Sequence, residues 1–325
     1  MTERVARFHA HGGPEVIQWE EVDLPAPGAG EVRFRTTAAG LNFIDTYYRK
    51  GLYPSPLPSG LGVEGAGVVE AIGPGVTGVS VGDRVCNFGP NLGAYATARN
   101  IAADALFHIP DGISDEVAAA ILLKGCTTEF LVERCAKVEP GMPVLVHAAA
   151  GGVGLLLVQW LKHVGAVVIG TVGSDDKIPL ARAAGADHVI QSRREDTAKL
   201  VREITNGAGV RVTFDGIGMK MWDTSLKSTG KRGLLISYGN AGGPVNGIGL
   251  ATLAAHGSLF CTRPTLYHYY DTPEDRAAGS GRLFDLVAKG VLNPNIGQRY
   301  ALFDVAQAHA DLEARRTTGA TVLLP

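Results

Sequence analysis

The clearest chemical pattern in the sequence is Ala149-x-Gly151-x-x-Gly154, which follows an apolar run at residues 144–146. Apolar residues then recur at helical spacing as far as Val164, so the segment is predicted to form a strand, a tight turn and a helix. Small residues let the backbone approach a charged group, and the first N–H groups of a helix point toward it. We therefore expect a dinucleotide pyrophosphate to be bound by the backbone of Gly151, Gly152, Val153 and Gly154. Because Ala149 replaces the first glycine of the usual pattern, the alternative is a turn whose glycines serve only packing.

The next predicted strand, residues 167–172, ends in Gly173-Ser174, and Lys177 follows one turn later. In dinucleotide-binding folds an acidic residue about 20 positions after the glycine turn usually holds the adenosine ribose. Here a hydroxyl group and a cation follow the strand instead, and both suit a 2′-phosphate. The sequence therefore favours NADPH, with Ser174 and Lys177 as ligands of its phosphate.

Strand and helix signals alternate around this turn across residues 121–265, which indicates an α/β domain with a doubly wound parallel sheet. The strands are expected near 143–148, 166–172, 187–190, 211–215, 232–237 and 258–262, and the helices near 152–164, 176–184, 195–205 and 219–228. Residues 1–120 show short alternating strands broken by Gly and Pro, typical of a β-rich domain. Residues 266–325 contain helical patterns at 282–289 and 304–315 and a last strand at 321–324, expected to return to the first domain.

Composition is that of an ordinary globular protein. The chain has 325 residues, more than one hydrophobic core usually supports, and its formal net charge of −2 provides no broad basic surface for nucleic acid or membrane lipid. The first residues lack the apolar stretch of a signal peptide, and no long apolar run follows. The four cysteines are scattered, so we expect free thiols and a cytoplasmic protein.

Further motifs run through nearly the whole chain: Gly12-Gly13-Pro14-Glu15, Gly40-Leu41-Asn42-Phe43-Ile44-Asp45, residues 58–67, Gly82-Asp83-Arg84-Val85, Gly93-Ala94-Tyr95, residues 147–154, and Gly239-Asn240 with Thr262-Arg263-Pro264. With these motifs the sequence resembles the NADPH:quinone oxidoreductases, relatives of zeta-crystallin in the zinc-free branch of the medium-chain dehydrogenases/reductases. The resemblance implies a GroES-like catalytic domain at residues 1–120 and a Rossmann domain for NADPH at 121–265. It also implies a homodimer, formed at an edge strand within residues 257–262.

The resemblance also suggests which residues surround the reaction. Asn42 and Thr127 would lie beside the nicotinamide, Tyr47 and Tyr53 would flank the electron acceptor, and Lys124 could stabilise negative charge on the acceptor oxygen. The alternatives are that Tyr47 packs under the first domain, Tyr53 covers a turn, and Lys124 lies on the surface. The implied cofactor ligands continue with Tyr238, Gly239, Asn240, Thr262 and Arg315, although Arg315 could equally belong to a solvated helix face.

One position departs from the family pattern. Close relatives carry a tyrosine after the third strand of the Rossmann sheet, where it helps to hold the adenine and the 2′-phosphate. This chain has Ser192 followed by Arg193. Either Arg193 takes over the phosphate, or the protein discriminates less between NADPH and NADH.

No metal is expected. Where zinc-dependent relatives place Cys, His and Cys, this chain has Asn42, Val63 and Lys124, and these side chains do not form a zinc site. Asp45 is expected to cap a helix rather than to act as an acid, and His147 is expected to be a hydrogen-bonded core residue.

Three functions are compatible with these features. The first is reduction of a quinone by NADPH without a metal, by hydride or by single electrons. The second is reduction of an activated C=C bond, as in enals and enones, with the same cofactor residues and a different acceptor pocket. The third is a non-enzymatic role, as a structural protein or an RNA-binding protein, against which the slight overall acidity argues.

Overall fold

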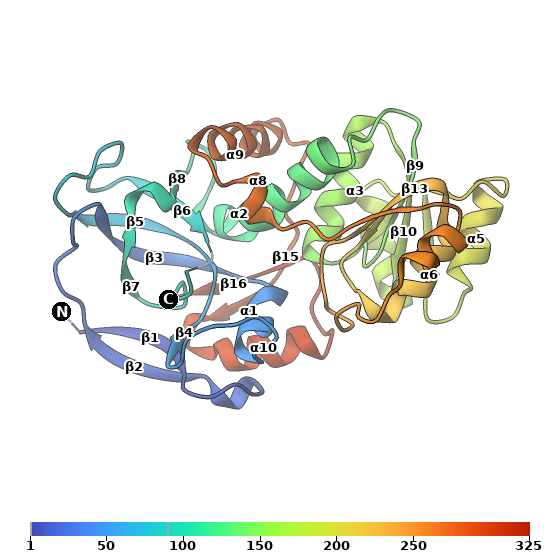
Figure 1. Cartoon of the computed structure of the whole chain (residues 1–325). Coiled ribbons are helices and arrows are strands. Elements are labelled where there is room, and N and C mark those ends of the chain that lie inside the picture. Colours follow the sequence, from blue (N-terminus) through green and yellow to red (C-terminus); the bar gives the residue numbers. More distant parts are fainter. Residues whose placement is uncertain (1, 90) are drawn as a thin grey trace. The chain divides into compact units, whose positions relative to one another are not determined.

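The computed structural model describes residues 2–89 and 91–325, which form two compact units. The first unit contains the chain up to Lys124 together with Thr272–Phe284 and Pro294–Pro325, and the second contains Gly125–Asp271 and Asp285–Asn293 (Figure 1). The division after Lys124 falls within helix α2 (Asp115–Glu129), which the strand and helix signals of the sequence did not predict.

The first unit is built mainly from β-strands. One sheet runs in the order β15-β16-β3-β5-β6-β8, with β7 also paired to β3, and a smaller sheet runs in the order β2-β1-β4. The strands are β1 (Thr2–Phe8), β2 (Gln18–Asp23), β3 (Glu31–Leu41), β4 (Ser59–Gly60), β5 (Glu64–Ile72), β6 (Arg84–Phe88), β7 (Ala98–Ala102), β8 (Leu106–His108), β15 (Ile296–Ala301) and β16 (Ala320–Leu324). Its further helices are α1 (Phe43–Arg49) and α10 (Val305–Glu313).

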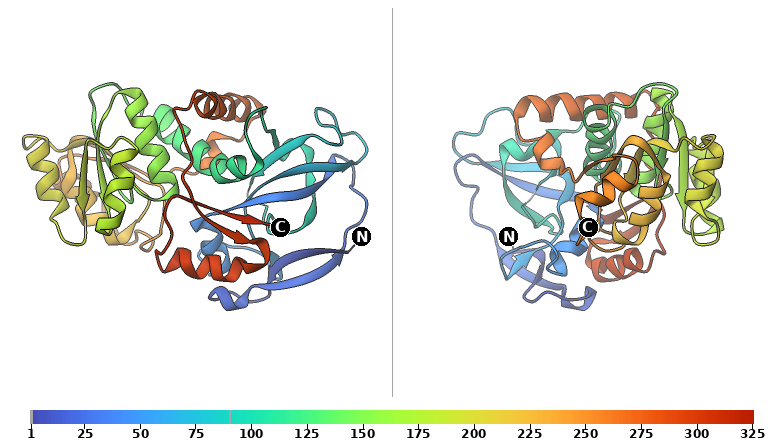
Figure 2. Two further views of the ribbon diagram at one scale, coloured as in Figure 1. Left: turned by 180° about the vertical axis from the view of Figure 1, so that it is seen from behind. Right: turned by 45° about the vertical axis from the view of Figure 1, so that its right-hand side comes forward.

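Strand β3 is the centre of this unit. Its residues alternate between buried and partly buried over the first half, as expected for a strand with one face on a core, and it becomes buried throughout near Leu41. The C-terminal strand β16 pairs antiparallel with β3, so that Val322 lies opposite Gly40 (Figures 1 and 2). The end of β3, just before α1, therefore lies between the C-terminal strand β16 and strand β5.

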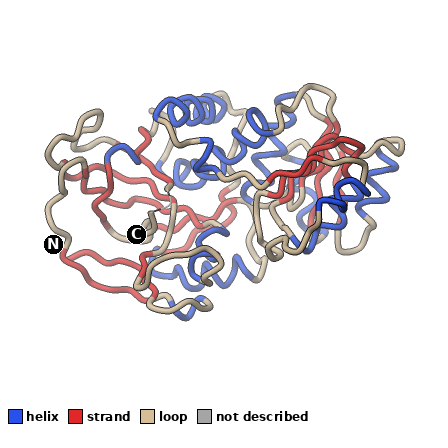
Figure 3. The backbone as a smooth tube through the Cα atoms, viewed as in Figure 1, coloured by secondary structure: helices blue, strands red, loops and turns tan. Residues whose placement is uncertain are grey.

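The second unit contains a parallel six-stranded sheet in the order β11-β10-β9-β12-β13-β14, which is the doubly wound order 3-2-1-4-5-6. Helices lie on both faces of this sheet (Figure 3). The strands are β9 (Pro143–Val146), β10 (Val167–Val172), β11 (His188–Gln191), β12 (Val210–Asp215), β13 (Thr229–Ser237) and β14 (Phe260–Thr262). The helices are α3 (Gly152–Val164), α4 (Ile178–Ala183), α5 (Thr197–Ile204), α6 (Trp222–Ser228), α7 (Leu250–Ala255) and α8 (Leu266–Tyr269), with a π-helical segment at Phe130–Cys135.

The predicted doubly wound parallel sheet is therefore confirmed, and each of its six strands overlaps the predicted position. The tail differs in one respect, because the helix expected at residues 282–289 is α9, Pro273–Ala288, and starts nine residues earlier. The four cysteines are free thiols, as expected. Within the part of the chain that the structure describes, no helix has both the length and the apolar character needed to cross a bilayer.

Candidate active site

The predicted pyrophosphate turn has the features that such a turn requires. Helix α3 starts at Gly152, no side chain caps its N-terminus, and its first turn contains no acidic residue. A Cβ atom on Gly154 would lie 2.1 Å from the carbonyl oxygen of Ala148, so only glycine lets the helix pack this closely on the turn. The first N–H groups of a helix have no partner within it, and no acidic side chain of the first turn of α3 competes for them. These residues therefore fit a dinucleotide pyrophosphate.

The end of β10 brings together the residues predicted to bind the 2′-phosphate. Ser174 is the residue before a short 3₁₀ turn, Asp175–Lys177. A Cβ atom on Gly173 would lie 3.7–3.9 Å from three atoms of the Arg193 guanidinium, so this cation from the loop after β11 reaches the end of β10. Arg193 is exposed, and its guanidinium forms no ion pair or hydrogen bond with the described residues. It is thus available to an anion.

The neighbours of Arg193 are engaged differently. The hydroxyl of Ser192 donates to the backbone oxygen of Val172 at 3.1 Å, which fixes the loop on β10. Arg194 forms an exposed ion pair with Asp175 at 2.9 Å between Nη1 and Oδ2. A hydrogen bond from Ser174 lowers the pKa of Asp176, so a carboxylate also faces this hydroxyl. The sequence analysis did not weigh these two aspartates.

The loop after β13, which holds Tyr238, Gly239 and Asn240, packs directly on the turn after β12. A Cβ atom on Gly216 would lie 2.8 Å from the ring of Tyr238, and one on Gly239 would lie 2.4 Å from the oxygen of Gly216. The absence of side chains at Gly216 and Gly239 allows these two loops to touch. Thr262, another predicted ligand, ends the edge strand β14 of the same sheet.

His147, at the end of β9, is a core residue as expected. It is fully buried, with Nδ1 3.0 Å from the hydroxyl of Thr171 and Nε2 3.1 Å from that of Ser225. Burial lowers the pKa of His147, which keeps the ring neutral. Its hydrogen bonds join β9, β10 and α6 beneath the turns that carry the cofactor residues.

In the first unit, Asn42 and Asp45 form the start of helix α1. Asp45 is fully buried, and its carboxylate accepts hydrogen bonds from Asn42 N at 2.8 Å, Val63 N at 3.1 Å and Tyr95 Oη at 2.6 Å. The expected capping role is confirmed, with Asp45 at the third helical position and Asn42 as the N-cap. Burial raises the pKa of Asp45 to about 7, partly opposed by the hydrogen bond from Tyr95.

Glu64, at the start of β5, joins two of the predicted catalytic residues. It is fully buried, and its Oε2 atom accepts from Asn42 Nδ2 at 2.8 Å and from Lys124 Nζ at 3.2 Å. Lys124 is only 5% exposed, so the alternative of a surface lysine is wrong. The sequence analysis assigned no role to Glu64. The missed signal is an acidic residue that begins an otherwise apolar strand.

Tyr47 and Tyr53 belong to an aromatic cluster of the first unit. Their ring centroids are 5.3 Å apart in a T-shaped arrangement, and Tyr48 contacts Tyr53 in the same way at 5.6 Å. Tyr47 is buried and Tyr53 is partly exposed. Both rings therefore pack within this aromatic cluster, and part of the Tyr53 side chain remains exposed.

The two remaining predicted residues lie on helix α2 and just after helix α10. Thr127 is on α2, three positions after Lys124, and is partly buried. Arg315 follows α10 in a left-handed backbone conformation, with φ at 61°, and is exposed. Its neighbour Arg316 forms an ion pair with Asp311.

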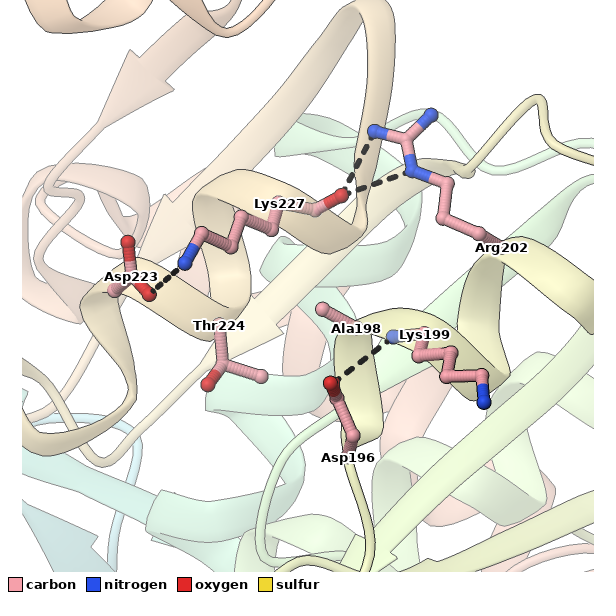
Figure 4. A pocket seen from close by; sticks show the side chains of 7 residues that line it. All are labelled: Asp196, Ala198, Lys199, Arg202, Asp223, Thr224 and Lys227. Carbon is pink, nitrogen blue, oxygen red and sulfur yellow. Dashed lines mark hydrogen bonds and ion pairs between the residues drawn. The ribbon is translucent and has the colours of Figure 1, made fainter.

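A groove of about 470 Å³ lies between α5 and α6, on the second unit (Figure 4). It is lined by Asp196, Ala198, Lys199, Arg202, Asp223, Thr224 and Lys227. Its charges are largely satisfied within the protein, since Lys227 pairs with Asp223 at 2.6 Å and Arg202 donates to backbone oxygens. No predicted site residue lines it, so it is not the candidate active site. Among residues 2–89 and 91–325, no three His, Cys, Asp or Glu side chains gather in a way that could hold a metal ion.

Comparison with known proteins gives matches over the full chain. Residues 28–111 match the family described as "Alcohol dehydrogenase GroES-like domain", and residues 152–270 match "Zinc-binding dehydrogenase". The chain is 51% identical to a quinone oxidoreductase of Pseudomonas aeruginosa over 100% of both sequences. It is 44% identical to a 2-haloacrylate reductase of a Burkholderia species, over 98% of each. The solved quinone oxidoreductase of Escherichia coli complexed with NADPH matches with a TM-score of 0.97 and 45% identity, covering 99% of this chain and 100% of that one.

Proposed function

This chain belongs to the quinone oxidoreductase family of the medium-chain dehydrogenase/reductase superfamily, and we propose that it reduces quinones with NADPH. The observation that carries this proposal is 51% identity to a quinone oxidoreductase over the full length of both proteins. The E. coli relative, at 45% identity in the structural match, binds NADPH in its solved structure. The glycine turn before α3 and the cation at the end of β10 are consistent with that cofactor.

Each end of the cofactor has its proposed ligands. The backbone of Gly151, Gly152, Val153 and Gly154 would bind the pyrophosphate at the start of α3. Ser174, Lys177 and Arg193 would bind the 2′-phosphate, with Ser192 holding the loop rather than the phosphate, because its hydroxyl is already bonded to Val172. Tyr238, Gly239, Asn240, Thr262 and Arg315 complete the proposed set of ligands.

For the reaction itself, we propose roles for residues of the first unit and of α2. When bound, NADPH supplies a hydride that, with one proton from solvent, converts a quinone into a hydroquinone. The ammonium group of Lys124 would stabilise negative charge on the acceptor oxygen, Asn42 and Thr127 would orient the nicotinamide, and Tyr47 and Tyr53 would contact the acceptor ring. No zinc takes part in this scheme, because Asn42, Val63 and Lys124 offer no thiolate, imidazole or carboxylate.

Reduction of an activated C=C bond is the second candidate. The full-length match to a 2-haloacrylate reductase at 44% identity favours it, since that relative's name describes such a substrate. The two activities would share the cofactor residues and differ in the space for the acceptor.

The test is NADPH consumption by the purified protein with 1,4-benzoquinone, compared with an α,β-unsaturated aldehyde and with 2-chloroacrylate. We expect the highest kcat/KM for the quinone, unchanged by a chelator. A large preference for the aldehyde or the haloacrylate would replace the first proposal with the second. Loss of activity with a chelator would overturn the metal-free scheme.

We also propose that the protein is a cytoplasmic homodimer. Strand β14 is at the edge of the parallel sheet, and its Phe260 side chain is 62% exposed. An unpaired edge with an exposed aromatic residue suits pairing with a second copy. The free cysteines suit a reducing compartment.

A further inference from the structure

Glu64 is a buried carboxylate that accepts hydrogen bonds from groups around the proposed reduction site. Its Oε2 atom accepts from Asn42 and Lys124, as described above, and its Oε1 atom accepts from Leu123 N at 2.6 Å. Glu64 therefore binds the side chain of Asn42, directly after β3, and two successive residues of α2, Leu123 and Lys124. Its exposed fraction is zero, so water does not compete for these bonds.

The backbone around Glu64 is shaped to leave room for this carboxylate. Gly40 on β3 lies opposite Glu64 in the sheet register. A Cβ atom on Gly40 would lie 2.3 Å from Oε2 of Glu64 and 2.2 Å from the oxygen of Ala119. Any larger residue would displace the carboxylate or helix α2. Only glycine at position 40 therefore leaves room for the Glu64 carboxylate beside helix α2.

The same arrangement fixes the amide of Asn42 from two directions. Its backbone N–H donates to Asp45, and its Nδ2 atom donates to Glu64 and to the oxygen of Gly40, the latter at 3.3 Å. The N–H groups of this side chain are therefore directed into the protein. An amide held in this way keeps one orientation and does not rotate to suit a ligand.

Glu64 also provides a counter-charge for Lys124. Burying an ammonium group that is only 5% exposed is unfavourable unless a counter-charge offsets its lost hydration. The salt bridge to Glu64 supplies such a counter-charge within the first unit. Removal of the Glu64 charge would therefore weaken the attraction that holds the Lys124 head group in place.

We propose that Glu64 is a positioning residue for quinone reduction, which holds the head group of Lys124 in place and fixes the amide of Asn42. This inference rests on the proposed function, because it assigns Glu64 to the same reaction. It acts through the two side chains and does not itself touch the acceptor.

The test is a double-mutant cycle with Glu64→Gln and Lys124→Met, assayed with NADPH and 1,4-benzoquinone. Glutamine has the shape of glutamate and still offers an acceptor to Leu123, but its NH2 group faces Asn42 and Lys124, so it removes both the charge and the acceptor at Oε2. We expect each single variant to lose roughly 10- to 100-fold in kcat, the range for removing one aligned electrostatic group. The double variant should lose clearly less than the product of the two single losses, because part of the effect of Glu64 is exerted through Lys124. The dissociation constant of NADPH, from fluorescence titration, should change by less than about twofold.

Glu3→Gln is the matched control. Glu3 is also a buried acid of the first unit, bonded to Arg35 and Thr97, and it contacts none of the proposed catalytic residues. We expect it to lower the melting temperature and to leave kcat unchanged.

Two results would overturn the inference: a Glu64→Gln variant with wild-type kcat, or losses that multiply in the double variant. If Glu64→Gln does not fold, Lys124→Met is assayed alone, and a wild-type kcat in that variant would also refute the proposal. A wild-type protein that reduces no quinone would instead refute the proposed function.

Discussion

Replacement of Arg193 by alanine tests how this chain recognises its cofactor. The guanidinium lies beside Gly173 at the end of β10. Arg193 directly follows Ser192, the position after β11 where the family resemblance implies a tyrosine in close relatives. If Arg193 binds the 2′-phosphate, its loss should weaken NADPH binding and leave NADH binding unchanged, because NADH has no phosphate at that position.

The size of the effect follows from the exposure of the side chain. A hydrogen bond to a charged group contributes about 1.5–3 kcal/mol, and about 1.4 kcal/mol corresponds to a tenfold change in Kd. Arg193 is exposed, so solvent and salt screen its charge and favour the lower end of this range. We therefore expect NADPH affinity to fall about tenfold.

The assay is fluorescence titration of the purified protein with NADPH and with NADH at low salt, repeated at high salt. The wild-type preference for NADPH should decrease as salt rises. Arg194→Ala is the matched control, because Arg194 is the adjacent arginine and is already paired with Asp175. Equal weakening of both cofactors by Arg193→Ala, or an equal effect of Arg194→Ala on NADPH, would refute the assignment.

Three further results are expected. Gly154→Ala should weaken both NADPH and NADH at least tenfold in titrations and lower the melting temperature, because its Cβ would lie 2.1 Å from the oxygen of Ala148; unchanged binding would contradict the turn geometry. Burial raises the pKa of Asp45 from 3.8 to about 7, so the folded protein retains a proton that the unfolded chain releases, and this contribution to stability falls as the pH rises from about 4 to 7. Burial lowers the pKa of His309 to about 3, and its contribution to stability changes with pH in the opposite direction. The test therefore compares wild type with Asp45→Asn, because both proteins contain His309. The melting temperature of wild type minus that of the variant should be larger at pH 5 than at pH 7.5. If the proposed dimer pairs through β14, Phe260→Lys should convert it to a monomer in light scattering, and a dimer that persists in the variant would contradict an interface at β14.

Local sequence patterns predicted the elements of the second unit well. The strand, turn and helix at residues 143–164 were predicted because apolar periodicity and glycine act within a few residues of one another. Helix α9 was predicted to start too late, because its first half has few apolar residues. A stronger signal was present in Thr272-Pro273-Glu274-Asp275, where the Thr272 hydroxyl accepts from Asp275 N at 3.1 Å and proline occupies the first helical position.

The buried polar contacts of the first unit could not be predicted in this way. Glu64 is 22 residues from Asn42 and 60 from Lys124 in the sequence, and only the pairing of β3 with β5 and the position of α2 bring them together. Residue type indicated that Asp45 caps a helix, but not that Tyr95 and Val63 also donate to it. The resemblance identified the positions near the reaction, while the structure supplied the hydrogen bonds that hold them.

These contacts also give a physical reason for the proposed absence of zinc. Asn42, Val63 and Lys124, the three positions that resemble zinc ligands in relatives, are bound by two buried carboxylates: Asp45 accepts from Asn42 N and Val63 N, and Glu64 accepts from Asn42 Nδ2 and Lys124. Each carboxylate already accepts three hydrogen bonds, so neither has the open coordination that a divalent ion requires. A zinc ion bound to Glu64 would have to displace the ammonium of Lys124 from this carboxylate. In this chain the ammonium group of Lys124 already provides a positive charge at one of the three positions that resemble zinc ligands in relatives.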